Sequence, residues 1–138
     1  MTNKLSLDLG EGKEPSFKRK ILQNIIVDRK SKYTVVGGYV DSKEEIKSFI
    51  GELLRDKYFQ KSIHNTYAYR IRLENGSILE GKNDDGEKGA GNCILRELQR
   101  SEVNNMIIVV TRYFGGIHLQ ADRFKNVIDA SKEILKHI

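Results

Sequence analysis

Two glycine-rich loops hold the charged side chains best placed for chemistry in this chain. The first loop places three carboxylates, Asp84, Asp85 and Glu87, within four residues. Such a cluster suits a metal ion or a partner, and it equally suits the N-terminus of a following helix, where negative charge is stabilising. The second loop joins Arg112 to Gly115 and Gly116 after an apolar run. Successive glycines let backbone amides approach an anion, and they also allow a tight turn. Each loop therefore has both a binding and a structural interpretation.

His64 and Cys93 are the candidates for nucleophilic catalysis. The two residue types can act as base and nucleophile, but their spacing does not make them neighbours. A lone cysteine at the start of a helix is usually a small buried side chain. We therefore expect no catalytic residue, no cofactor and no bound metal. A hydrolase that holds a metal with His64 and the acidic loop is a lower-ranked alternative.

The net charge of +5 lies in one segment of the sequence. Between Phe17 and Tyr33, six basic residues face one acid, Asp28, so the rest of the chain is neutral. This basic strip consists of Lys18, Arg19, Lys20, Arg29, Lys30 and Lys32. A basic strip can bind RNA or an acidic protein face. Lysines at a sheet edge also protect that edge from aggregation.

The composition favours one small domain. The chain has 138 residues, 38% of them hydrophobic, and we expect a flexible lead-in over residues 1–16 and a single domain with one core over residues 17–138. The longest apolar run, Met106–Val110, is far shorter than the roughly twenty residues of a membrane span. Residues 1–16 contain no apolar segment typical of a secretory signal. We therefore expect a cytoplasmic protein.

The periodicity of apolar residues predicts the elements that position these loops. Two strands are expected in residues 17–40 with a break at 28–31, followed by a helix over 43–58 that Ser42 and Glu45 cap. A hairpin turns at Asn75–Gly76, a short helix ends near Ser101, and residues 106–110 are typical of a central strand covered on both faces. A last helix begins near Asp122. This order predicts an α/β two-layer sandwich, a mixed sheet with helices packed on one face.

Five motifs in a fixed order resemble the IMPACT family. They are DRKSKY at residues 28–33, HNTYAYRI at 64–71, DDGE at 84–87, VVTRYFGG at 109–116 and DRF at 122–124. The last motif is closer to the eukaryotic branch than to the bacterial YigZ branch. The resemblance implies the fold of the second domain of ribosomal protein S-five. The chain has Cys93 and Gln120 where the family usually has a polar residue and a glycine, and it has only the lead-in where eukaryotic members carry an RWD domain.

The resemblance also implies a function. Eukaryotic members are regulators of translation during amino-acid starvation, without established enzymatic activity. They bind the ribosome-associated activator of the kinase that phosphorylates the alpha subunit of initiation factor two, and they are described as binding monomeric actin. The expected partner is therefore a protein, and an RNA- or ribosome-binding module is the alternative. The expected partner or anion surface contains His64, Tyr67, Arg70, Asp84, Asp85, Glu87, Arg112, Tyr113, Gly115, Gly116 and Arg123. Of these, His64, Arg70, the loop 84–87 and residues 112–116 are expected to lie near one another at one edge of the sheet.

Overall fold

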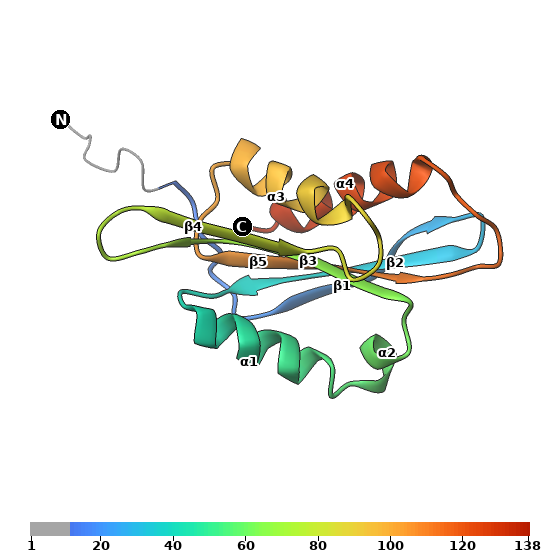
Figure 1. Cartoon of the computed structure of the whole chain (residues 1–138), viewed down its shortest axis with the longest axis horizontal. Helices are drawn as coiled ribbons and strands as arrows, with labels where there is room; N and C mark the ends of the chain where they lie inside the picture. Colours follow the sequence, from blue (N-terminus) through green and yellow to red (C-terminus); the bar gives the residue numbers. More distant parts are fainter. Residues whose placement is uncertain (1–11) are drawn as a thin grey trace.

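A five-stranded antiparallel sheet supports the part of the chain that the computed structural model describes, residues 12–138 (Figure 1). The strands are β1 (Lys20–Asp28), β2 (Ser31–Tyr39), β3 (His64–Arg72), β4 (Ile78–Asn83) and β5 (Met106–Tyr113). The helices are α1 (Lys43–Leu53), α2 (Lys57–Gln60), α3 (Ala90–Arg100) and α4 (Asp122–Leu135). The order of strands in the sheet is β1-β2-β5-β3-β4, so the predicted central strand is confirmed.

Helices cover both faces of this sheet, rather than one face as the sequence predicts. Figure 1 shows α3 and α4 on one side and α1 and α2 on the other. Alternate side chains of β5 enter two separate buried clusters: Ile108 and Val110 face α3 and α4, whereas Ile107 and Val109 face α1. Because successive strand residues point to opposite faces, a continuous apolar run in β5 requires an apolar layer on each side.

All named strand pairs are antiparallel, so the predicted mixed sheet is wrong, while the α/β class is confirmed. The reason is where β5 enters the sheet. Helix α3 carries the chain back along the sheet, and β5 then pairs with β2 and β3, with His64 opposite Arg112. If β5 ran in the same direction beside β4, the two strands would form a parallel pair. Apolar periodicity does not distinguish the two positions.

The predicted helix over residues 43–58 is two helices. Ser42 Oγ accepts a hydrogen bond from Glu45 N–H at 3.1 Å, so the predicted N-cap is confirmed. The Glu45 carboxylate accepts from Asp41 N–H at 2.9 Å, one residue before the position that a standard capping box uses. Helix α1 ends at Leu53 because Asp56 starts a new helix: its Oδ1 accepts from Tyr58 N–H at 2.9 Å. An aspartate that caps a following helix favours this break over continuation.

The described part of the predicted lead-in contacts the domain. Lys13 N–H donates to Glu102 O at 3.0 Å, and Asn104 N–H donates to Lys13 O at 2.7 Å. Residues 1–11, which make up most of that lead-in, lie outside the described residues. Within residues 12–138, no helix has the length and apolar composition needed to cross a bilayer.

The β1–β2 hairpin has a tight turn without a glycine, and Gly115 packs closely against the backbone of that turn. Arg29 and Lys30 both have left-handed backbones, with φ of 47° and 72°, as a two-residue type I′ turn requires. A Cβ on Gly115 would lie 2.1 Å from the carbonyl carbon of Lys30. Gly116 has a φ of 92°. The structural interpretation of this loop therefore applies to both glycines.

The predicted tight turn at Asn75–Gly76 is part of a longer loop. Leu73 N–H donates to Ser77 O at 2.8 Å, which places three residues inside the loop. Gly76 takes the left-handed conformation, with a φ of 88°. This arrangement is the common three-residue hairpin with a glycine in the left-handed position.

Replacing Gly115 with alanine will destabilise the fold, because the new methyl group meets backbone that cannot move without distorting the hairpin turn. We expect the free energy of unfolding of Gly115→Ala to fall by about 1–3 kcal/mol in urea denaturation. Gly51→Ala in α1 is the matched control, because a Cβ there meets nothing within 4 Å. That control is expected to be neutral or stabilising by up to about 1 kcal/mol. Equal stability of the two variants would contradict the tight packing at Gly115.

Candidate functional site

The two glycine-rich loops meet at one end of the sheet. The register places His64 at the start of β3 opposite Arg112 near the end of β5, and Tyr33 of β2 on the other side of Arg112. The loop that follows β4 lies against His64: Asp85 O is 2.7 Å from His64 Nδ1. The predicted meeting of the acidic loop with Arg112 therefore takes place at this sheet end.

A buried ion pair between Glu87 and Arg112 joins the two loops. Arg112 Nη1 donates to both Glu87 oxygens, at 3.0 and 3.2 Å. Each residue is only 5% exposed. Burying two charges carries a large desolvation penalty, which is offset only when the two charges are in close contact. The ion pair of Arg112 with Glu87 therefore has a structural role. Any partner must bind to the groups that this pair leaves accessible.

Two further cationic or polar groups surround the Glu87 carboxylate. His64 Nε2 lies 3.6 Å from Glu87 Oε2, and Arg123 Nε at the start of α4 lies 3.7 Å from the same oxygen. Arg123 Nη1 also donates to Gln120 O at 2.6 Å. One carboxylate is thus shared by three nitrogen-bearing side chains from three segments of the chain.

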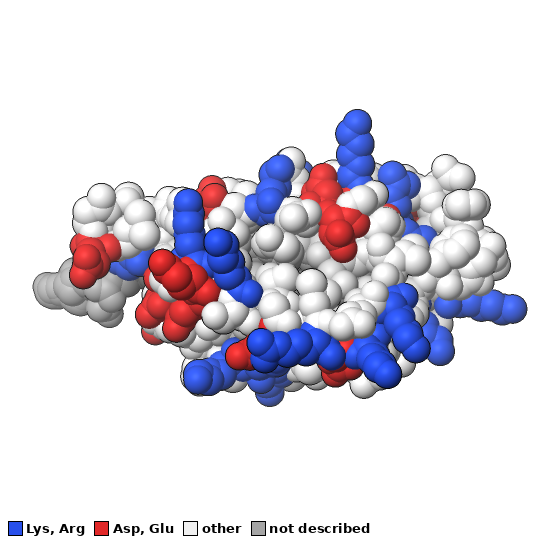
Figure 2. Space-filling view, turned by 60° about the horizontal axis from the view of Figure 1, so that its bottom comes forward, with Lys and Arg blue, Asp and Glu red and all other residues white. Residues whose placement is uncertain are grey.

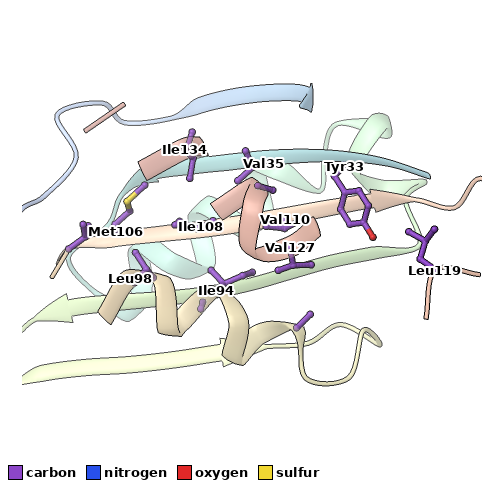
Figure 3. Close-up of a cluster of buried hydrophobic side chains, with 14 residues drawn as sticks. Tyr33, Val35, Ile94, Leu98, Met106, Ile108, Val110, Leu119, Val127 and Ile134 are labelled. Carbon is purple, nitrogen blue, oxygen red and sulfur yellow. The ribbon is translucent and has the colours of Figure 1, made fainter. Parts of the chain in front are cut away.

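These side chains line a pocket of about 340 Å³. Its lining consists of Ile63, His64, Glu87, Arg112, Phe114, His118, Leu119, Gln120 and Arg123. Leu119 is buried and belongs to the core between the sheet and α3–α4, and Figure 3 shows it with Tyr33 at one end of that core. The pocket therefore opens where the hydrophobic core ends, with an apolar side chain on its wall.

Asp84 and Asp85 have structural contacts of their own. The Asp84 carboxylate accepts hydrogen bonds from Gly89 N–H at 2.9 Å and Gly91 N–H at 2.8 Å, and thereby caps the start of α3. These bonds, from Gly89 first, hold the pKa of Asp84 below its ordinary value. The Asp85 carboxylate accepts from Asn65 N–H at 2.7 Å. The helix-capping interpretation of the acidic loop therefore describes Asp84.

Seven of the eleven predicted members of the surface do not line the pocket. Asp84, Gly115 and Gly116 have the structural roles described above, and four others lie elsewhere. Tyr67 and Asp85 line a separate hollow beside α1, and Tyr113 donates to Tyr58 O of α2. Arg70 pairs with Glu80 at 3.0 Å, opposite Met106 rather than Arg112. The prediction of one cluster is wrong for Tyr113, because adjacent strand positions face opposite sides, and for Arg70, which lies about 20 Å along β3. It is also wrong for the Asp85 carboxylate, which binds Asn65 N–H although the Asp85 carbonyl oxygen contacts His64.

The pocket also contains residues that sequence reasoning missed. Ile63, Phe114, His118, Leu119 and Gln120 complete its lining. Gln120 has a φ of 56°, a left-handed conformation that glycine adopts without strain. The resembled family usually has a glycine where this chain has Gln120, and this difference was the signal that could have drawn attention to the turn.

The catalytic alternatives receive no support from the geometry. Cys93 does not line the pocket that contains His64, and burial raises the pKa of its thiol, which disfavours the reactive thiolate. Within residues 12–138, no group of three or more His, Cys, Asp and Glu side chains is arranged to hold a metal ion. The acidic loop is instead engaged in capping and ion pairing.

The basic strip is divided between the two ends of β1, which are about 25 Å apart at 3.3 Å per residue. Arg19 pairs with Glu52 of α1 at 3.2 Å. At the other end, Arg29 pairs with Asp28 at 3.0 Å and with Asp122 of α4. The face drawn in Figure 2 likewise shows basic side chains interspersed with acidic ones and an uncharged region between them. The strip in the sequence is therefore not one continuous basic surface.

The capping role of Asp84 predicts a defined pH dependence. Its pKa is lowered in the folded protein, so its contribution to stability is present above its unfolded pKa, near 4, and is lost as the pH falls through the lower folded pKa. Asp84→Ala is expected to lower the free energy of unfolding by about 1 kcal/mol at pH 7. The difference from the parent should shrink below pH 4 in urea denaturation. A difference that stays constant down to pH 2 would contradict this assignment.

Comparison with known sequences shows which family the chain resembles. The model of the Impact N-terminal domain matches residues 29–135. The protein IMPACT homolog of Dictyostelium discoideum is 40% identical over 110 residues, and that of Schizosaccharomyces pombe is 37% identical over 108 residues. The alignments cover 80% and 78% of this chain but only 32% and 39% of those relatives. The chain thus spans about a third of the length of these relatives.

Solved structures agree with the sequence matches. A crystal structure of a hypothetical protein has a TM-score of 0.76 and 26% identity, over 88% of this chain and 58% of that one. The structure of the two-domain translational regulator Yih1 has a TM-score of 0.59 and 30% identity, over 85% of this chain and 46% of that one. The resemblance found in the five motifs is confirmed, and the chain belongs to the IMPACT family.

Proposed function

We propose that this chain is a non-enzymatic, protein-binding regulatory domain that acts in translational control in the cytoplasm. Membership of the IMPACT family and the similarity to a translational regulator, Yih1, support this role. The chain matches only part of the relatives' length. The proposal therefore concerns the contribution of this domain, and it does not extend to the activity of a longer protein.

The pocket beside Glu87 is the observation that carries the protein-binding proposal. The charged groups of this pocket form ion pairs with one another, as the buried Glu87–Arg112 pair illustrates. Glu87 is thereby committed to ion pairing and is poorly placed to act as a general base. Two apolar side chains at the opening, Ile63 and Phe114, are 47% and 42% exposed. Exposed apolar groups around a few fixed polar ones are typical of a recognition surface.

The partner that fits the family best is the ribosome-associated activator of the initiation-factor kinase, with monomeric actin as a second protein to be tested. The domain would damp the kinase by occupying its activator. An RNA partner is less favoured, because the basic strip is divided and Arg19 and Arg29 are already paired with acids. We expect only weak RNA binding that falls steeply with salt.

A capture experiment with purified components tests this proposal. The immobilised chain is incubated with the kinase activator or with monomeric actin, with and without ribonuclease. We expect the activator to be retained equally in both conditions. We also expect added chain to lower phosphorylation of the alpha subunit of initiation factor two in a reconstituted kinase reaction.

A charge-neutralised variant distinguishes protein binding from RNA binding. Lys18, Lys20, Lys30 and Lys32 are all exposed or half-buried and form no ion pair within residues 12–138, so their replacement by glutamine leaves the pocket intact. This variant should retain the activator as well as the parent does. Capture that disappears with ribonuclease or with this variant would favour the RNA-binding alternative, as would sub-micromolar binding of an oligonucleotide at physiological salt.

A further inference from the structure

The pocket beside Glu87 has an excess of positive charge. With both imidazoles counted as neutral, its lining carries two guanidinium groups, Arg112 and Arg123, and one carboxylate, Glu87. No second acidic residue of the described chain lines it. Glu87 therefore neutralises one of the two arginines, and one positive charge remains without an acidic counterpart in the pocket.

The two arginines also have unused hydrogen-bonding capacity. A guanidinium carries five N–H donors, but Arg112 meets Glu87 through Nη1 alone, and its buried Nε has no hydrogen-bond partner within residues 12–138. Arg123 donates from Nη1 to Gln120 O and is about one-third exposed. A planar guanidinium with free donors is well suited to a carboxylate.

The surroundings of the pocket are both basic and apolar. Lys32 pairs in register with Tyr113, so Lys30 and Lys32 of the β1–β2 hairpin lie at the same end of the sheet as Arg112. The opening is flanked by Ile63 and Phe114, and the Phe114 ring contacts the His118 ring at a tilt of 43°, with ring centroids 5.4 Å apart. An occupant that matches these features carries one negative charge and an adjoining apolar group.

We propose that this pocket binds an acidic side chain of a partner protein, an aspartate or glutamate whose carboxylate meets Arg123 and Arg112 while an adjoining apolar residue packs on Phe114. The proposal rests on the proposed protein-binding function and specifies its chemistry. A single carboxylate balances the one excess positive charge, whereas a phosphate monoester would place a charge of about −1.5 to −2 close to Glu87. The pocket volume of about 340 Å³ lies at the small end of the range for ligand sites, which suits a side chain rather than a nucleotide chain.

A titration with short peptides, followed by amide chemical shifts, tests the proposal. The probe is an acetylated leucyl-glutamyl-leucine amide, and the matched peptide has glutamine in place of glutamate. Leucyl-leucine with a free C-terminus tests whether a terminal carboxylate serves equally well, and inorganic phosphate and a uridine oligonucleotide test the competing ligands. We expect the glutamate peptide to shift the amides of residues 114–120 and to bind at least ten-fold more tightly than the glutamine peptide.

Two arginine variants make the test specific to the pocket. Arg123→Gln removes a pocket cation and its 3.7 Å contact with Glu87, but it leaves the two hydrogen bonds between Arg112 and Glu87 in place. It should weaken binding of the glutamate peptide at least ten-fold. Arg100→Gln is the control with the same charge change, because Arg100 lies at the far end of α3 and is 62% exposed. The control should bind like the parent. Thermal denaturation of both variants verifies that they are folded.

Several outcomes would overturn the proposal. They are equal binding of the two peptides, an unchanged affinity in Arg123→Gln, and tighter binding of phosphate or the oligonucleotide than of the glutamate peptide. Capture of the kinase activator by the Arg123→Gln variant at parental strength would overturn this inference while the proposed function stands. Pocket-dependent peptide binding without any capture of the activator would instead overturn the proposed partner and retain the inference.

Discussion

The rest of the site depends on the buried ion pair between Glu87 and Arg112. Two charges that are each 5% exposed are tolerated in a protein interior only when they meet at close range, and here the contacts are 3.0 and 3.2 Å. The pair fastens the loop that starts α3 to the end of β5, the central strand. Asp84 in the same loop caps α3, and Arg123 brings the start of α4 to the same carboxylate. The pocket exists because these three segments converge on one buried charge.

Most elements of the fold can be predicted from local sequence signals, but their arrangement cannot. The strands of residues 20–39, the N-cap of α1 and the central strand agree with the structure because each depends on neighbours in the sequence. The number of layers was predicted wrongly, although the unbroken apolar run at residues 106–110 already implied cover on both faces. The direction of β5 relative to its neighbours depends on its insertion beside β3, a long-range choice that periodicity does not encode.

The site shows the same division between local and long-range information. Glycine-rich loops and family motifs pointed to His64, Glu87, Arg112 and Arg123, and the fold brings these four side chains together. Tyr113 and Arg112 are adjacent in a strand, so their side chains point to opposite faces of the sheet, and this could be predicted from the sequence. The distance of Arg70 from the pocket needs the register, and the place of His118 in the lining needs the course of the loop before α4. Charge and glycine content pointed to these loops, but only the fold shows which side chains line the pocket.

The dependence of the pocket on its ion pair is tested most directly by a double-mutant cycle on Glu87→Gln and Arg112→Met, read out as the free energy of unfolding in urea. Each single substitution leaves a buried group without its partner, and we expect losses of about 3–5 kcal/mol. The double variant should lose less than the sum of the two, with a coupling of at least about 2 kcal/mol. Single losses below about 1 kcal/mol that add within about 0.5 kcal/mol would contradict the role assigned to this pair.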